Sequence, residues 1–576
     1  MSNFSSMQSN SVFFQLGISH HYQLYCFLLG IVGATGILTL YKTLTTKSDI
    51  LVLDGPTTNS IVWGSASDMF DDEGGLEFQD KLKNTYGSAC RIRGPFGATE
   101  LWVSDPRALQ EILVKGHDSF REPDWFTTWL ELVFGPVVAT VYGHQHKIQR
   151  KILNPVFTTN HVRNYAYHNN NRTKGESFIR FVEILKSEVE TNETNTEIID
   201  IFKWVHLVSL EIIGQAGIGH SFGILEGNVP DYLAASRDFF ALMAEMWYFH
   251  PFVTFFSRIG TASFRRAIVE WIPHRPVQRI KNVSDTMHKT AVEIMRHKRE
   301  AMHNGTLDSE VAAGKDIMTA LLRQNLVVAP HDQMTDEEIL SQVNGLAFAG
   351  HDTTSSALSQ AINMLAEYQE VQTKLRDEIR TAHRSYGKNL DYDQLNSLSY
   401  LDAVCRECLR LHAPGAFAIR VATEDWTLPL HYPIKTKDEK VTLSTIRIPK
   451  GTTLHIALRA ANKDERTWGV DAEEFKPERW LEPLPASVSD ARMPGIYSSM
   501  MTFLGGPRGC PGMKFSQLEM KIVLSRLVSS FGFRPSGDAI RWKATGIAKP
   551  HVQRPDGKFS ETPMMPIRVT VLEETE

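Results

Sequence analysis

The stretch FLGGPRGCPG, Phe503 to Gly512, places one cysteine in a loop of glycines and prolines late in a 576-residue chain. The chain has only five cysteines, too few and too scattered for a disulfide framework. A thiolate is a strong ligand for iron, and a glycine-rich loop lets backbone N–H groups approach the sulfur without a Cβ in the way. The residues from Met513 onward are typical of an amphipathic helix, whose dipole would favour the anion of Cys510. The pattern therefore predicts that Cys510 is a metal-binding thiolate.

The loop also resembles a known family. Phe503, Gly506, Arg508, Cys510 and Gly512 have the identities and spacing of the haem-binding loop of the cytochromes P-450. This resemblance implies that the Cys510 thiolate is the axial ligand of the iron of haem b. It also implies that Phe503 and Arg508 contact the cofactor, because an arginine reaches a carboxylate well. A free cysteine in a surface turn is the alternative interpretation.

The composition is that of a globular protein. Hydrophobic residues make up 42% of the chain and charged residues 22%, and the net charge of −5 argues against a nucleic-acid binder. Most segments between about 107 and 380 are typical of amphipathic helices. Ser88 to Pro106 predicts a β-hairpin, and strand character returns at 418–459 and 566–572. We expect a mainly α protein with small β-sheets, the cytochrome P-450 fold, as a single large domain over residues 61–576.

An uncharged stretch near the N-terminus, LYCFLLGIVGATGILTLY, is 18 residues long and covers residues 24–41. About 20 apolar residues span a bilayer as a helix. No Lys or Arg occurs in residues 1–23, whereas Lys42 and Lys47 follow the stretch, so the positive-inside rule places residues 1–23 in the lumen. A cleaved signal peptide is the alternative, but no basic segment precedes the stretch. The sequence predicts a single transmembrane anchor, a linker at 42–60 and a cytosolic catalytic domain at the endoplasmic reticulum membrane.

The stretch AGHDTTS, Ala349 to Ser355, lies inside a long helix predicted from Thr335 to Glu367. A threonine hydroxyl can bond a carbonyl one turn back and loosen a helix, which gives room for a small ligand. Asp352 and Thr353 would then stand beside that ligand as a proton relay. The stretch resembles the oxygen-activation motif of the cytochromes P-450, with the acid and the alcohol both present. A tolerated kink in a structural helix is the alternative.

Glu407 and Arg410 lie three residues apart and share one face of a predicted helix. Exposed pairs of this kind are common, but the resemblance implies a structural ion-pair triad completed by Arg479 in the segment FKPERW. Such a triad would hold the fold around the haem and take no direct part in the reaction. Cys405 and Cys408 form a CxxC pattern in the same helix, but no second pair accompanies it, which favours packed cysteines over a zinc or redox site.

Three further residues match cofactor-binding positions of the family. His146 and Arg150 stand where many members have a tryptophan and an arginine that contact the haem propionates. The histidine departs from that pattern, although its ring can still donate to a carboxylate. Arg420, in AFAIRVATED, resembles the arginine that grips the other propionate. As plain charges, Lys147, Arg150 and Lys151 could instead form a solvated helix face.

The resemblance implies a haem-dependent monooxygenase. Electrons would come from NADPH through NADPH–cytochrome P-450 reductase, with cytochrome b5 as an additional donor, and Asp352 and Thr353 would supply protons. The basic residues expected to face an acidic reductase surface are Lys147, Arg150, Lys151 and Lys514.

A mostly apolar substrate pocket is expected, so the substrate would be a lipophilic molecule delivered from membrane lipid. The candidate lining residues are Phe348, Ala349, the loop Pro123 to Val138 with Trp125, Phe126, Trp129 and Phe134, and the stretch Met246 to Phe249. Similarity to fungal enzymes favours a terpenoid of fungal secondary metabolism. Two other functions stay open: a haem-thiolate isomerase or dehydratase that needs no reductase, and a non-catalytic haem or lipid-binding membrane protein. The intact Asp352-Thr353 pair disfavours the isomerase, and a binding protein would not need it.

Overall fold

The computed structural model describes residues 48–58, 60, 62–71, 74–163, 176–190, 195–307, 314–544 and 546–573. The predicted anchor at 24–41, the luminal segment at 1–23 and residues 42–47 and 59 of the linker lie outside these residues. Within them, one apolar segment, Ile201–Ile218, is long enough to cross a membrane, but 89% of it is buried inside the protein. That segment is therefore a core helix.

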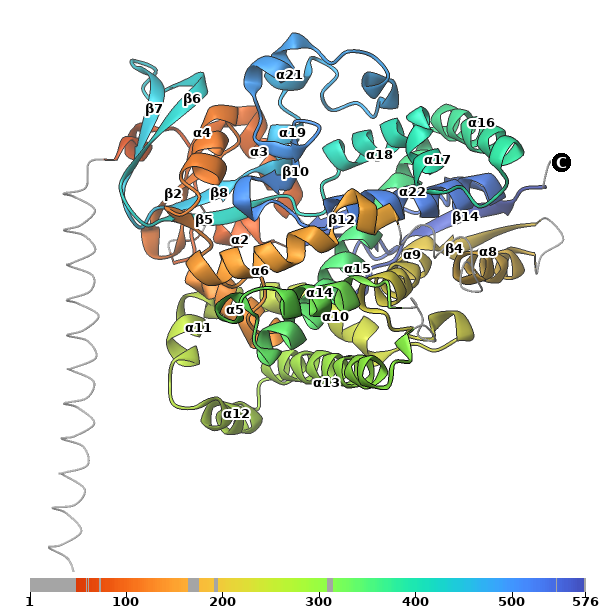
Figure 1. Cartoon of the computed structure of the whole chain (residues 1–576). Coiled ribbons are helices and arrows are strands. Elements are labelled where there is room, and N and C mark those ends of the chain that lie inside the picture. The colour runs from red at the N-terminus through yellow and green to blue at the C-terminus, as the bar shows by residue number, and fades with distance from the viewer. Residues whose placement is uncertain are drawn as a thin grey trace, which may run out of the picture.

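Helices dominate the described chain (Figure 1). The N-terminal half contains α2 (Ala66–Met69), α3 (Gly75–Tyr86), α4 (Pro106–Gln110), α5 (Asp124–Phe134), α6 (Gly143–Val156), α8 (Glu176–Val189), α9 (Ile201–Ile212), α10 (Asp231–Glu245), α11 (His250–Ser257), α12 (Ala262–Trp271) and α13 (Arg275–Asn304). The C-terminal half contains α14 (Ile317–Val327), α15 (Asp336–Glu367), α16 (Gln369–Tyr386), α17 (Tyr392–Ser397), α18 (Ser399–Leu411), α19 (Leu458–Asn462), α20 (Glu465–Trp468), α21 (Ala486–Ala491) and α22 (Met513–Ser530). The prediction of a mainly α protein with small sheets is confirmed.

The strands form small sheets at the edges of the helical body. Their bounds are β1 (Ala89–Arg93), β2 (Thr99–Val103), β3 (Phe120–Arg121), β4 (Thr196–Asp200), β5 (Ala418–Ala422), β6 (Trp426–Lys435), β7 (Thr442–Ile448), β8 (Thr453–Ile456), β9 (Gly495–Tyr497), β10 (Met500–Gly505), β11 (Phe531–Pro535), β12 (Ile540–Ala544), β13 (Ala548–Val552) and β14 (Pro566–Val571). The largest sheet has the order β1-β2-β8-β5-β3, with β1 and β2 as the predicted hairpin. Hairpins β9–β10, β12–β13 and β6–β7 stand apart from it.

A three-stranded sheet joins segments that are distant in the chain. Its order is β11-β14-β4, so β14 is the central strand and pairs antiparallel with both neighbours. Pro566 lies opposite Asp200, and the N–H of Ile201 donates to the carbonyl of Met565 over 2.9 Å. The start of α9 is therefore fixed by residues near the end of the described chain.

Helix α15 crosses the middle of the molecule, where the main apolar core surrounds it (Figure 1). It begins as predicted: the Thr335 hydroxyl accepts from the N–H of Glu338, and the Glu338 carboxylate accepts from the N–H of Thr335. The hydroxyl of Thr353 donates to the carbonyl of Ala349 over 2.7 Å. The helix nevertheless continues without a break, so the predicted loosening is wrong. Gly350 instead serves packing, since a Cβ there would lie 2.7 Å from the side chain of Ile213.

The predicted loop at Pro123 to Val138 is also wrong, because Asp124–Phe134 forms helix α5. Pro123 immediately precedes its first turn, a position that proline favours because its missing N–H is not needed there. Trp129 and Val133, four residues apart, are both buried on one face. Gly135, at a φ of 80°, ends the helix. Part of the apolar spacing expected in a pocket loop is thus the core-facing side of a helix.

Candidate active site

The Cys510 loop lies between strand β10 and helix α22. The N–H of Cys510 donates to the carbonyl of Phe503 over 2.9 Å, which turns the chain back on the strand. Gly506 has a φ of +67°, and a Cβ there would lie 2.0 Å from the carbonyl oxygen of Leu113. A residue with a side chain would therefore be excluded at that position. The loop therefore lies tightly against the backbone at Leu113.

The surroundings of the Cys510 sulfur favour an anion that has a cationic partner. Removal from water raises the pKa of the thiol, while the backbone N–H groups of Gly512 and Met513 and the charge of Arg150 oppose that rise. The Arg150 guanidinium donates to the carbonyl of Gly509 over 2.9 Å, directly before the cysteine. A metal cation would hold such a thiol deprotonated, and N–H donors to the sulfur tune a thiolate ligand. The residues present thus fit the iron of a haem.

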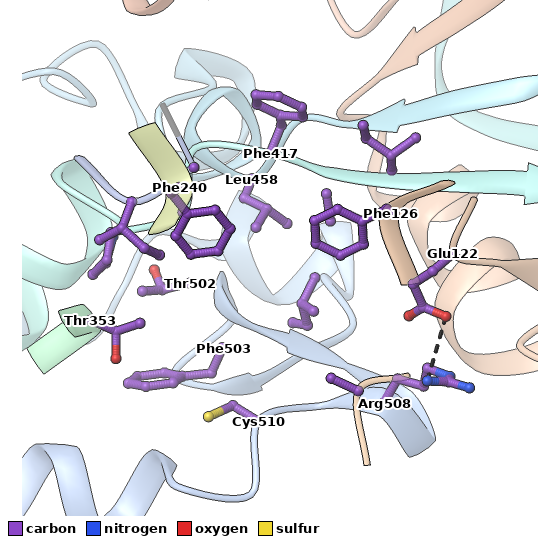
Figure 2. Close-up of a pocket in the computed structure, with 18 of the residues that line it drawn as sticks. Glu122, Phe126, Phe240, Thr353, Phe417, Leu458, Thr502, Phe503, Arg508 and Cys510 are labelled. Carbon is purple, nitrogen blue, oxygen red and sulfur yellow. Dashed lines mark ion pairs between the residues drawn. The ribbon is translucent and has the colours of Figure 1, made fainter. Parts of the chain in front are cut away.

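A cavity of about 430 Å³ lies beside the sulfur. Figure 2 shows Cys510 and Phe503 along one side, Phe240 and Leu458 opposite them, and Thr353 of α15 at the edge. Other apolar residues of the lining are Phe70, Trp125, Phe126, Val138, Met243 and Phe417. The arrangement places a thiol, a hydroxyl and a large apolar surface around one enclosed space.

Only part of the predicted pocket lies in this lining. Trp125 and Phe126 contribute to it as expected. Phe348 instead packs on Phe134 and Phe240, with ring centroids 4.8 and 5.6 Å apart. Phe348 precedes Thr353 by five residues, so their side chains leave α15 in directions about 140° apart around the helix axis.

The predicted propionate-binding residues gather at one corner of the cavity. His146, Arg150, Arg420 and Arg508 all belong to the lining. All three arginines also donate to a backbone carbonyl: Arg150 to Gly509, Arg420 to Ile419 and Arg508 to Val141. Burial and the neighbouring arginines lower the pKa of His146 to about 4, which keeps its ring neutral.

Glu122 is a charged residue of this corner that the sequence did not reveal. Its carboxylate lies 3.1 Å from Arg420 and 3.4 Å from Arg508, and Figure 2 shows the second contact. The Arg508 guanidinium also lies 4.7 Å from the ring centre of Tyr142. In the stretch REPD, Glu122 is one of three charged residues, so nothing in the local pattern distinguished it.

Asp352 and Thr353 point in different directions, because adjacent helical residues are about 100° apart. Thr353 faces the cavity. Asp352 is buried behind the helix, where its carboxylate pairs with Lys549 of β13 over 2.8 Å. Burial raises the pKa of Asp352, and the ammonium of Lys549 opposes that rise. Lys549 was missed, although a lone lysine in the apolar strand AKPHV was a usable signal.

The structure brings Glu407, Arg410 and Arg479 together in the core, away from the cavity. The Glu407 carboxylate lies 2.8 Å from Arg410 and 3.3 Å from Arg479. Two further residues join them: the indole of Trp480 donates to Glu407 over 2.9 Å, and Arg479 pairs with Asp471 over 2.8 Å. Arg410 also donates to backbone carbonyls of the segment that follows α19. The cluster ties α18 to that segment.

A cysteine in a glycine-rich loop, opposite a threonine of a central helix across an apolar cavity, is the arrangement that a haem-thiolate protein requires. Residues 55–551 match the family model of the cytochromes P-450, and the chain belongs to that family.

Fungal relatives support the same assignment. The chain is 36% identical over 554 residues to cytochrome P-450 monooxygenase 212 of Postia placenta, which covers 95% of this chain and 98% of that protein. It is 37% identical to a ganoderic acid synthetase of Ganoderma lucidum, over 85% of this chain and 89% of that protein. A cytochrome P-450 monooxygenase of Hericium erinaceus is 34% identical over 91% of this chain and 94% of its own length. The chain is therefore an enzyme, a monooxygenase with a haem-thiolate cofactor.

Proposed function

We propose that this monooxygenase inserts one atom of dioxygen into a lipophilic small molecule, a terpenoid of fungal secondary metabolism. Two electrons come from NADPH through NADPH–cytochrome P-450 reductase, with cytochrome b5 as an additional donor. The observation that carries the proposal is the apolar cavity between Cys510 and Thr353. Its aromatic and aliphatic lining suits a hydrocarbon skeleton, and the relatives described above are fungal enzymes.

Each residue of the site has a role in this proposal. Cys510 binds the haem iron, and haem bound through a thiolate activates dioxygen. Arg420, Arg508 and His146 bind the propionates, and Phe503 packs beside the sulfur. Thr353 holds a proton at the cavity surface, with Asp352 behind it. The apolar lining orients the substrate and excludes water.

Arg150 has a second contact besides the propionate expected for it. Its guanidinium donates to the carbonyl of Gly509, which stabilises the Cys510 loop and leaves other N–H groups for a propionate. The basic face expected to meet the reductase comprises Lys147, Arg150, Lys151 and Lys514. Lys147, Lys151 and Lys514 remain exposed there. Charge reversal at Lys147 and Lys151 should slow reduction by NADPH, and an unchanged rate would argue against this face.

We also propose that the protein is held at the endoplasmic reticulum membrane by the anchor at 24–41 and by a second contact. Helices α11 and α12, at the lower left of Figure 1, expose large apolar side chains. These are Phe252, Phe255, Phe256, Ile259, Phe264, Ile268 and Trp271. The side chain of Trp271 is the extreme case, with 87% of its surface exposed. Several large exposed apolar side chains within one short segment of the chain are typical of a membrane contact.

The test uses microsomes that contain the full chain and a fungal reductase. A lipophilic fungal extract is incubated under heavy-isotope dioxygen, with and without NADPH, and products are analysed by mass spectrometry. We expect NADPH-dependent products that carry one labelled oxygen. Unlabelled products that form without NADPH would instead show an isomerase or dehydratase. No product under either condition would favour a binding protein.

A further inference from the structure

A buried polar cluster lies behind α15, on the side away from the cavity. His206 of α9, and His351 and Asp352 of α15, are all buried, and their ligand-type atoms lie within 4.8 Å of one another. The ring centres of His206 and His351 are 4.0 Å apart. Lys549 joins them through its 2.8 Å ion pair with Asp352, and its ammonium also donates to the carbonyl of Arg237 over 3.1 Å. Four ionisable groups from α9, α15 and β13 thus share one site inside the core.

The two histidines have spare hydrogen-bonding capacity. His206 Nδ1 lies 3.1 Å from the hydroxyl of Ser355. Its Nε2 has no hydrogen-bond partner among the residues that the structure describes. The ring of His351 faces the backbone of His206 and has no side-chain partner among those residues. Buried polar groups are nearly always paired, so the unpaired nitrogen calls for a functional explanation.

Two histidines and a carboxylate could in principle bind a divalent metal ion. Lys549 argues against that use, because its ammonium already stands 2.8 Å from the carboxylate that a metal would need. A second cation beside it would be repelled at low dielectric. The chemistry left to the cluster is the transfer of protons.

We propose that His206, His351 and Lys549 are positioning residues that conduct protons to Asp352 and thus to Thr353 at the cavity. The proposal rests on the monooxygenase function proposed above and extends it to the source of the protons. In each turnover, two electrons from NADPH and two protons from solvent reduce one oxygen atom of dioxygen to water. The other oxygen atom enters a C–H bond of the substrate. The cluster surrounds Asp352, the residue directly before Thr353 in α15.

Neutral imidazoles suit this task. Burial and the charge of Lys549 lower the pKa of both rings, that of His351 to about 3, so both stay neutral at physiological pH. A neutral imidazole accepts a proton on one nitrogen and releases one from the other. The charged or titratable groups that face the rings are Asp352, Lys549, Arg237 and the two histidines themselves. We therefore expect the turnover rate to show no change of slope with pH near about 6.5, the ordinary pKa of histidine.

The experiment compares the full-length holoprotein with its His206→Gln and His351→Gln variants, each reconstituted with reductase in lipid vesicles. Glutamine keeps a polar side chain but cannot exchange a proton in this way. His383→Gln is the matched control, because burial lowers the pKa of His383 to about 4 as well, but it lies on α16. The probe is dioxygen itself: NADPH-driven oxygen consumption is measured in light and heavy water between about pH 6 and about pH 8. Reduction under carbon monoxide, which needs no proton delivery to oxygen, is measured in parallel.

Oxygen consumption should fall roughly tenfold or more in the two variants. A positioned acid–base group can contribute a rate effect of this size. The solvent isotope effect should rise, while reduction under carbon monoxide and the control variant stay unchanged. Unaltered oxygen consumption and isotope effect in both variants would overturn the proton-conducting role and leave the monooxygenase function standing. A divalent metal ion present in the same amount as the haem iron, and absent from His206→Gln, would overturn the proton-conducting role in favour of a metal site. Failure of the unmodified protein to consume NADPH would overturn both proposals.

Discussion

Replacing Glu407 by glutamine should destabilise the protein strongly. Its carboxylate accepts hydrogen bonds from Arg410 at 2.9 and 2.8 Å, from Arg479 at 3.3 Å and from Trp480 at 2.9 Å. The N–H of Lys476 donates to it as well, over 3.2 Å. Glutamine conserves the volume but removes the charge and turns an amide NH₂ toward these donors. Arg410, which is fully buried, would keep its charge without an anion.

The expected loss is large because breaking a buried ion pair from one side costs about 3–5 kcal/mol. The matched control is Glu478→Gln, next to Arg479 in the same segment. Glu478 pairs with Lys374 over 2.8 Å at the surface, and such exposed pairs contribute about 1 kcal/mol or less. The two variants therefore separate a buried charge cluster from a surface one.

The free energy of unfolding in urea, followed by tryptophan fluorescence, measures both variants. Trp468 and Trp480 report on the cluster itself, since their rings lie 5.8 Å apart beside it. Glu407→Gln should lose several times more free energy than Glu478→Gln. Equal losses of about 1 kcal/mol or less would refute the reasoning, because the buried charges would then contribute no more than exposed ones.

The remaining predictions concern the ligand, the pH dependence of stability and the membrane contact. Cys510→Ala should leave purified protein almost without haem, measured by its absorbance, and a haem content equal to that of the unmodified chain would contradict the ligand assignment. Because burial depresses the pKa of His206 and of His351, the folded state binds fewer protons than the unfolded state. Stability should thus be fully present above about pH 6.5 and fall as the pH drops toward about 3, and a His206→Gln, His351→Gln double variant should flatten that slope in urea unfolding. An environment-sensitive fluorophore on a Phe255→Cys variant should shift to the blue when the full chain is placed in lipid vesicles. The same label on Val470→Cys, another exposed position, should not shift, and equal spectra would count against the membrane face.

Features coded by neighbouring residues were predictable from the sequence. The Cys510 loop and the start of α15 at Thr335 are each specified by a few adjacent positions, because turn and cap geometry are local. The Pro123 to Val138 segment was misassigned because apolar spacing at a helix core and in a pocket loop looks alike. Burial decides between them, and burial depends on partners elsewhere in the chain.

Contacts between distant segments were out of reach. His206 lies 149 residues before its partner Ser355, and Lys549 reaches Asp352 from a strand near the other end of the chain. No pattern within a single segment specifies such pairs. The family resemblance pointed to Asp352 of this cluster, but it gave no information about His206, His351 and Lys549.

The position of β14 has a consequence for synthesis in the cell. Strand β4 is made early, yet its partner at Pro566–Val571 follows more than three hundred residues later. At about 5–20 residues per second, the ribosome needs on the order of 20–70 s to cover that interval. During this time β4 lacks its partner strand, and an unpaired strand is a known template for aggregation. A nonsense mutation shortly before residue 566 would make that exposure permanent, so loss of a few codons there should direct nearly the whole chain to degradation.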